Sequence, residues 1–116
     1  MQITREAKGE TLIVRVAGEL DVQSAGTFRD QVDELFLASD FGRLLLNLSR
    51  VTFLDSTGLG AVLGRLRRVR AAGRQIVLVP PAGVARTVLD LAALGRAVPI
   101  YRSERAALGE GAQAHG

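Results

Sequence analysis

The residues best suited to chemistry are six consecutive ones, Asp55 to Gly60, which combine a carboxylate, two hydroxyls and two glycines. Apolar residues recur at helical spacing from there onward and predict a helix that begins within a residue or two of Ser56: Leu59, Val62, Leu63, Leu66 and Val69. The start of a helix has unpaired backbone N–H groups and the positive end of the helix dipole. Ser56 is therefore placed to carry a phosphoryl group, because the fold itself would stabilise the added anion.

Small residues on the same predicted helix indicate a contact surface beside Ser56. At about 100° per residue, Thr57, Gly60 and Gly64 lie next to Ser56 and away from the apolar stripe. Each glycine inside a helix costs about 1 kcal/mol relative to alanine, so two on one strip suggest close approach of another backbone. The alternative is an ordinary helix start, with Asp55 or Ser56 as N-cap and the glycines as turn residues.

Enzymatic chemistry lacks the residues that it needs. The single histidine, His115, lies at the C-terminal end and gives no serine an imidazole base or a histidine metal site. The glycines miss the dinucleotide spacing, and no Lys-Ser/Thr follows them to make a P-loop. We interpret Asp21 and Asp55 as helix caps or partner contacts, not as an acid and base pair. We therefore expect no enzyme activity, no cofactor and no metal.

Three segments resemble the STAS family, and within it the single-domain bacterial anti-anti-sigma factors: Gly18–Asp21, Val51–Gly60 and Leu89–Leu94. They occur in the family's order and at about its spacing, and the resemblance spans residues 1 to 108. It implies that Ser56 is phosphorylated by an anti-sigma factor that is also a serine kinase. Family members usually carry glycine where Ala93 stands, so the backbone there differs or Gly95 takes the left-handed position.

The resemblance also implies a partner switch in transcription regulation, in a stress response or sporulation. The unphosphorylated protein would bind the kinase and release a sigma factor, and a serine phosphatase would reset the phosphorylated form. The residues expected to contact the partner are Asp21, Asp55, Thr57, Gly58, Leu59, Gly60 and Gly64. Two alternatives stay open: an accessory STAS subunit of a transporter or signalling complex, and a module that binds a nucleotide or another small ligand.

Composition is consistent with a single cytoplasmic domain. The 116 residues are 47% hydrophobic and include no cysteine, enough for a core without disulfides or metal. The N-terminus lacks a signal-peptide core, and no apolar run reaches the roughly 20 residues of a membrane span. A net charge of +3 with few aromatic residues does not favour direct nucleic-acid binding. We interpret the cluster of arginines between positions 65 and 74 as a solvated outer face or as steering toward an acidic partner: Arg65, Arg67, Arg68, Arg70 and Arg74.

Strand and helix patterns alternate and predict an α/β domain, as the resemblance also implies, with a four- to five-stranded mixed sheet and about four helices mainly on one face. The predicted strands are Thr11–Ala17, ended by Gly18, then Arg43–Asn47, Gln75–Val79 and an edge strand Val98–Tyr101. A loop is expected between Asn47 and Asp55. The predicted helices are 24–38 with Ser24 as N-cap, 56–72, 83–91 with Val84, Val88, Leu89 and Leu91 inward, and 103–108. Residues 1–108 would form the domain and 109–116 a disordered tail.

Overall fold

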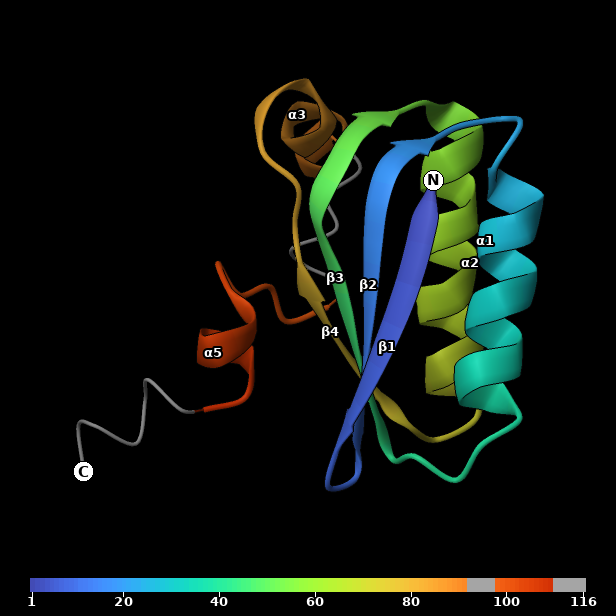
Figure 1. The fold of residues 1–116 in the computed structure, drawn as a ribbon, viewed down its shortest axis with the longest axis vertical. Coiled ribbons are helices and arrows are strands. Elements are labelled where there is room, and N and C mark those ends of the chain that lie inside the picture. The colour runs from blue at the N-terminus through green and yellow to red at the C-terminus, as the bar shows by residue number, and fades with distance from the viewer. Residues whose placement is uncertain (92–97, 110–116) are drawn as a thin grey trace.

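The fold is a four-stranded mixed sheet with helices on both faces, seen in a computed structural model that describes residues 1–91 and 98–109 (Figure 1). The strands follow one another across the sheet in chain order: β1 (Gln2–Lys8), β2 (Thr11–Leu20), β3 (Arg43–Leu54) and β4 (Gln75–Val79). β1 pairs with β2 antiparallel, whereas the β2–β3 and β3–β4 pairs are parallel. Each parallel pair therefore needs a helical crossover between its strands.

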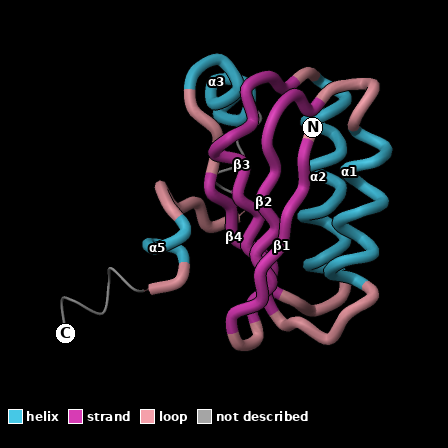
Figure 2. The backbone as a smooth tube through the Cα atoms, viewed as in Figure 1, coloured by secondary structure: helices cyan, strands magenta, loops and turns pink. Residues whose placement is uncertain are grey.

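The two faces of the sheet are covered unequally. The first face packs against α1 (Ala25–Val32), the π-helix η1 (Asp33–Leu37), α2 (Ser56–Ala71) and α3 (Gly83–Leu91), which share one buried apolar cluster with it. On the second face the short helix α5 (Glu104–Ala107) covers a smaller cluster around Ile13, Leu45 and Val77. Figure 2 shows α1 and α2 stacked along one side of the strands and α5 on the other. The predicted α/β class, with helices mainly on one face, is confirmed.

The strands are longer than the sequence pattern predicted. β3 continues to Leu54 where a loop was expected, because Leu48, Val51 and Leu54 keep their side chains in the core. β2 continues to Leu20 because Gly18 does not end the strand but lies within it at φ +98°. The predicted strand over residues 98–101 is reduced to one parallel bridge, between Ile100 and Leu78.

β1 is a strand for which no prediction was made. Only Ile3 and Glu6 along it are even partly buried, so its seven residues show little of the apolar alternation that marks a strand. Its pairing with β2, from Gln2 opposite Ala17 to Lys8 opposite Thr11, gives it its structure.

The predicted helices are present, with two corrections in how they are packed and capped. Val84, predicted inward, is 78% exposed, and Ala85 is buried in its place, whereas the predicted Leu89 and Val88 do pack in or against the core. Ser24 does precede α1, but its hydroxyl donates to the carbonyl of Glu19 rather than capping the helix. Ala93, Gly95 and most of the predicted tail, residues 110–116, lie outside the described residues.

Arg65 and Arg74 join α2 and the turn after it to the neighbouring helices, so the solvated-face interpretation is wrong for these two, whereas Arg68 is exposed as that interpretation predicts. Arg65 is 4% exposed, and its guanidinium lies 2.5 Å from an Asp33 carboxylate oxygen and donates to the Arg29 carbonyl at 3.1 Å. Arg68 binds the other Asp33 oxygen at 2.9 Å. Arg74 donates to the carbonyls of Phe36, Leu37 and Phe41 and stacks over the Phe36 ring. Arg67 and Arg70 are exposed.

We expect Arg65→Met to lower the free energy of unfolding by about 2 kcal/mol, because the variant loses a buried ion pair with Asp33 and a hydrogen bond from a charged donor to the Arg29 carbonyl. The matched control is Arg67→Met on the exposed side of the same helix, which should change stability by less than about 0.5 kcal/mol. Urea unfolding of both variants measures the difference. Equal effects of the two substitutions would contradict a role for Arg65 in joining α2 to η1.

The helix α5 is attached to the sheet through a carboxylate. Both oxygens of Glu104 accept from the Arg15 guanidinium, at 2.7 and 2.8 Å, and the Asn47 amide donates to one of them. These contacts, the Arg15 hydrogen bonds above all, lower the pKa of Glu104 from its ordinary 4.5. Ser103 caps the helix by accepting from the Ala106 N–H, as its place in the sequence predicted.

The lowered pKa of Glu104 predicts a loss of stability in acid. Below about pH 4.5 the unfolded chain takes up the proton before the folded protein does, so the stabilisation present at neutral pH declines as the pH falls further. Urea unfolding from about pH 7 to about pH 3 should show the advantage of wild type over Glu104→Gln shrinking on acidification. The exposed Glu34→Gln provides the control. A wild-type advantage that does not change with pH would contradict the ion pair's role.

Candidate functional site

Ser56 is the first residue of the sixteen-residue helix α2, and its side chain is exposed. The preceding residue, Asp55, is the N-cap: its backbone is extended and its carboxylate accepts from the Gly58 N–H at 2.7 Å. The helix start, predicted within a residue or two of Ser56, is therefore confirmed, and of the two candidate caps it is Asp55 that caps the helix. The hydroxyl of Ser56 lies at the positive end of a long helix, within reach of a visiting protein.

Asp55 also joins α2 to the loop that follows β2. Its second carboxylate oxygen accepts from the Val22 N–H at 3.0 Å, across thirty-three residues of sequence. The N–H of Asp55 points to the Leu20 carbonyl at 3.4 Å. The ends of β2 and β3 and the starts of α1 and α2 thus meet at one end of the domain, the upper end in Figure 1.

Asp21 acts within its own turn. Its carboxylate accepts from the N–H groups of Gln23 and Ser24, at 3.0 and 3.2 Å, and so orders the entry to α1. Asp55 thus caps a helix and Asp21 makes loop hydrogen bonds, and contact with a partner remains a prediction for each.

The glycines of α2 differ in what surrounds them. A Cβ on Gly58 would lie 2.1 Å from the Leu20 carbonyl oxygen, so the close approach there is made by the protein's own β2. A Cβ on Gly60 or Gly64 would meet nothing within 4 Å. With the exposed Thr57, these two positions leave an open strip along α2 beside Ser56, which we call the small-residue strip. Gly58 has a structural role, and Leu59 packs partly against the core.

Two apolar side chains near Ser56 were not recognised in the sequence. Val22 is 69% exposed in the loop bonded to Asp55, and Phe53 is 48% exposed two residues before Asp55. Each would have stood out as an apolar residue that the predicted core did not use. Contiguous exposed apolar patches are typical of surfaces that bind another protein, whereas single exposed apolar residues are common on any surface.

Other kinds of site find little support in the described part of the chain. Across residues 1–91 and 98–109, no three His, Cys, Asp or Glu side chains are grouped closely enough to hold a metal ion. None of the helices in those ranges combines the length and apolar character that a membrane crossing requires.

The family model for the STAS domain matches residues 2–107. The chain belongs to the STAS domain family. An anti-sigma F factor antagonist of Paenibacillus polymyxa is 34% identical over 110 residues, 95% of this chain and 94% of that protein. The crystal structure of TM1081 from Thermotoga maritima has a TM-score of 0.85 at 29% identity, over 93% of this chain and 92% of that one.

A third relative has been solved in two states of modification. The anti-sigma factor antagonist SpoIIAA in its unphosphorylated form has a TM-score of 0.76 at 26% identity, with 97% of each chain covered. The phosphorylated form of SpoIIAA, from Bacillus, has a TM-score of 0.71 at 27% identity, over 94% of this chain and 98% of that one. This STAS domain therefore has the fold of a protein that exists with and without phosphate.

The different surroundings of the glycines predict opposite effects of alanine. Gly60→Ala and Gly64→Ala should each raise the free energy of unfolding by up to about 1 kcal/mol, because alanine favours helix and the added methyl meets nothing. Gly58→Ala should lower it by about 1–3 kcal/mol, because its methyl overlaps the Leu20 carbonyl. Urea unfolding measures all three. Destabilisation by alanine at position 60 or 64 would show that the strip is not open.

Proposed function

We propose that this STAS domain is an anti-sigma factor antagonist controlled by phosphorylation of Ser56. The observation that supports this most directly is the exposed hydroxyl of Ser56 at the first position of a helix whose cap is supplied by the neighbouring Asp55. The names of the relatives, among them the Paenibacillus polymyxa anti-sigma F factor antagonist, support the same class of function.

The partner in this proposal is an anti-sigma factor with serine kinase activity. It would dock on the small-residue strip beside Ser56, where Gly60 and Gly64 let a partner approach the helix backbone closely. Val22 and Phe53 would add exposed apolar area to the same contact. Docking of the unphosphorylated protein would occupy the anti-sigma factor and release the sigma factor.

The kinase would supply everything that the phosphoryl transfer needs except the hydroxyl. In such reactions the nucleotide, the magnesium and the proton acceptor normally belong to the kinase, and the substrate offers a positioned oxygen. Ser56 meets that requirement because a rigid, capped helix holds it at the surface. A serine phosphatase would return the protein to its binding state.

The free-energy cost of a phosphate on Ser56 is small for the folded protein and large for its docked complex, so phosphorylation should change the partner and not the fold. On the free protein, the helix N-terminus stabilises an anion by roughly 0.3–1 kcal/mol, and two backbone N–H groups already bind the Asp55 carboxylate beside it. In a docked interface, an unpaired phosphate of about −1.5 to −2 charges would cost several kcal/mol to desolvate. About 2.8 kcal/mol is enough to weaken binding a hundredfold.

Phosphorylation can be tested directly with a cognate kinase. Incubation with the cognate anti-sigma factor kinase and ATP should add one phosphate to the wild-type protein and to Thr57→Ala, and none to Ser56→Ala, as measured by intact mass. Thr57 is the matched control because its hydroxyl is also exposed and lies one residue away. Modification of Ser56→Ala to the wild-type extent would place the phosphate elsewhere and overturn the proposal.

Binding tests the second half of the switch. Calorimetric titration of the anti-sigma factor should give equal affinities for wild type and Ser56→Ala, and an affinity about a hundredfold lower for the phosphorylated protein. Ser56→Glu should weaken binding in the same direction. Unchanged affinity after stoichiometric phosphorylation would exclude the partner switch and favour an accessory role in another complex.

A further inference from the structure

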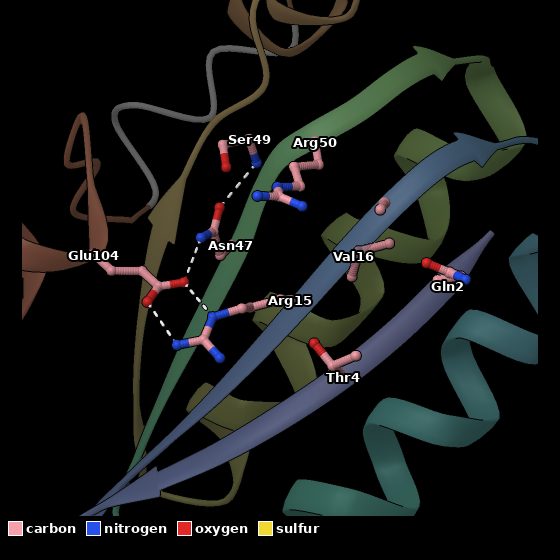
Figure 3. Close-up of a pocket in the computed structure, with 9 residues that line it drawn as sticks. Gln2, Thr4, Arg15, Val16, Asn47, Ser49, Arg50 and Glu104 are labelled. Atoms are coloured by element: carbon pink, nitrogen blue, oxygen red, sulfur yellow. Dashed lines mark hydrogen bonds and ion pairs between the residues drawn. The ribbon is translucent and has the colours of Figure 1, made fainter.

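A polar hollow of about 370 Å³ lies on the second face of the sheet, beside α5 and away from the helices that cover the first face. Three strands and α5 contribute to its lining (Figure 3). Val16 is among the lining residues, but most of the side chains drawn there are polar or charged. The hollow has no residue in common with the switch region around Ser56.

An irregularity in the sheet brings an arginine to this hollow. Arg15 pairs with Asn47 and Ala17 with Arg50, so β3 contains one more residue than β2 between these two pairs. Such a β-bulge redirects the side chains that follow it. As a result Arg50 lies opposite Ala17 and lines the hollow together with Arg15 and Asn47.

A chain of hydrogen bonds along one wall of the hollow fixes the bulge. The Ser49 N–H donates to the Asn47 side-chain oxygen at 2.9 Å, and the Asn47 amide donates in turn to Glu104. Glu104 accepts both bonds from Arg15, so the charge of Arg15 is already matched within the wall (Figure 3). Glu6 adds a second carboxylate to Arg15 at 2.7 Å.

Arg50 is the cation of the hollow whose charge remains unmatched. Over the described ranges 1–91 and 98–109, its guanidinium makes no ion pair or hydrogen bond, and the hydroxyls of Ser49 and Thr4 make no hydrogen bond either. Glu104 and Glu6 both bind Arg15, so the Arg50 guanidinium and the two hydroxyls are the groups of the hollow that remain free to donate. A free guanidinium beside two free hydroxyls suits a planar carboxylate or a tetrahedral phosphate group.

We propose that the hollow binds a small anion through a carboxylate or phosphate group held by Arg50. The planar guanidinium can donate two parallel hydrogen bonds to such a group, and the Ser49 and Thr4 hydroxyls can donate to its remaining oxygens. The volume is within the range of sites for small molecules. This binding activity is separate from the phosphorylation of Ser56.

Titration of the full-length, ¹⁵N-labelled protein by NMR tests the proposal with succinate and inorganic phosphate as probes and uncharged succinamide as the control. At least one anion should give saturable shifts at the backbone amides of Ala17, Ser49 and Arg50, and succinamide should give none. A response to succinate alone would identify a carboxylate ligand, and a response to phosphate alone a phosphate ligand.

Two variants that each lose one positive charge distinguish binding in the hollow from a general attraction of anions to the protein's positive charge. Arg50→Gln should weaken anion binding at least tenfold, whereas Arg67→Gln, at an exposed position on α2, should leave it unchanged. Because Arg50 is exposed and unpaired, the variant should keep the wild-type spectrum outside the hollow. No saturable shift with either anion, or equal weakening by both variants, would overturn the proposal. Neither result would bear on phosphorylation of Ser56.

Discussion

The arrangement of the site depends on one carboxylate that binds two backbone N–H groups from different elements. Asp55 accepts from Gly58 at the start of α2 and from Val22 in the loop after β2. The absence of a side chain at Gly58 lets the helix start lie against the Leu20 carbonyl. These contacts set where α2 begins and hence where Ser56 points. Ser56, one residue beyond the cap, is exposed.

Packing against the sheet explains why α2 can keep residues of low helix propensity on its outer side. Gly60 and Gly64 lower the intrinsic stability of the helix, yet its core side contributes Val62, Leu66 and Val69 to the main cluster. Tertiary packing of such a stripe supplies most of a helix's stability in a folded protein. The outer strip is therefore free to be shaped by contacts with other molecules, which local helix propensity alone would not favour.

An element of the fold or the site could be predicted from the sequence where the residues that determine it lie close together in the chain. The start of α2 followed from Asp55, the apolar stripe behind it and their spacing, all within fifteen residues, and the structure places it within the predicted range. β1 was missed because its structure comes from pairing with β2 and not from its own pattern. The bulge at Ser49 was invisible for the same reason, since a register shift exists only relative to a second strand. The exposure of Val84 depended on how α3 rotates against the sheet, which periodicity leaves open by about one residue.

The arginines show why charge counts predict so little about partners. Arg74 donates to the carbonyls of Phe36 and Leu37, at the end of η1, where a helix leaves its last carbonyls without intrahelical donors. Arg43 does the same for the Ala107 carbonyl at the end of α5. A guanidinium is suited to this role because its several N–H groups reach more than one oxygen and complement the negative end of the helix. Arg74 and Arg43 thus donate to carbonyls at the C-terminal ends of helices in neighbouring elements, and their charge is used within the protein. Within residues 1–91 and 98–109, an exposed arginine that faces no carbonyl or carboxylate, such as Arg50, keeps its charge available to external molecules, and the positions of such residues determine which surfaces can attract an anion.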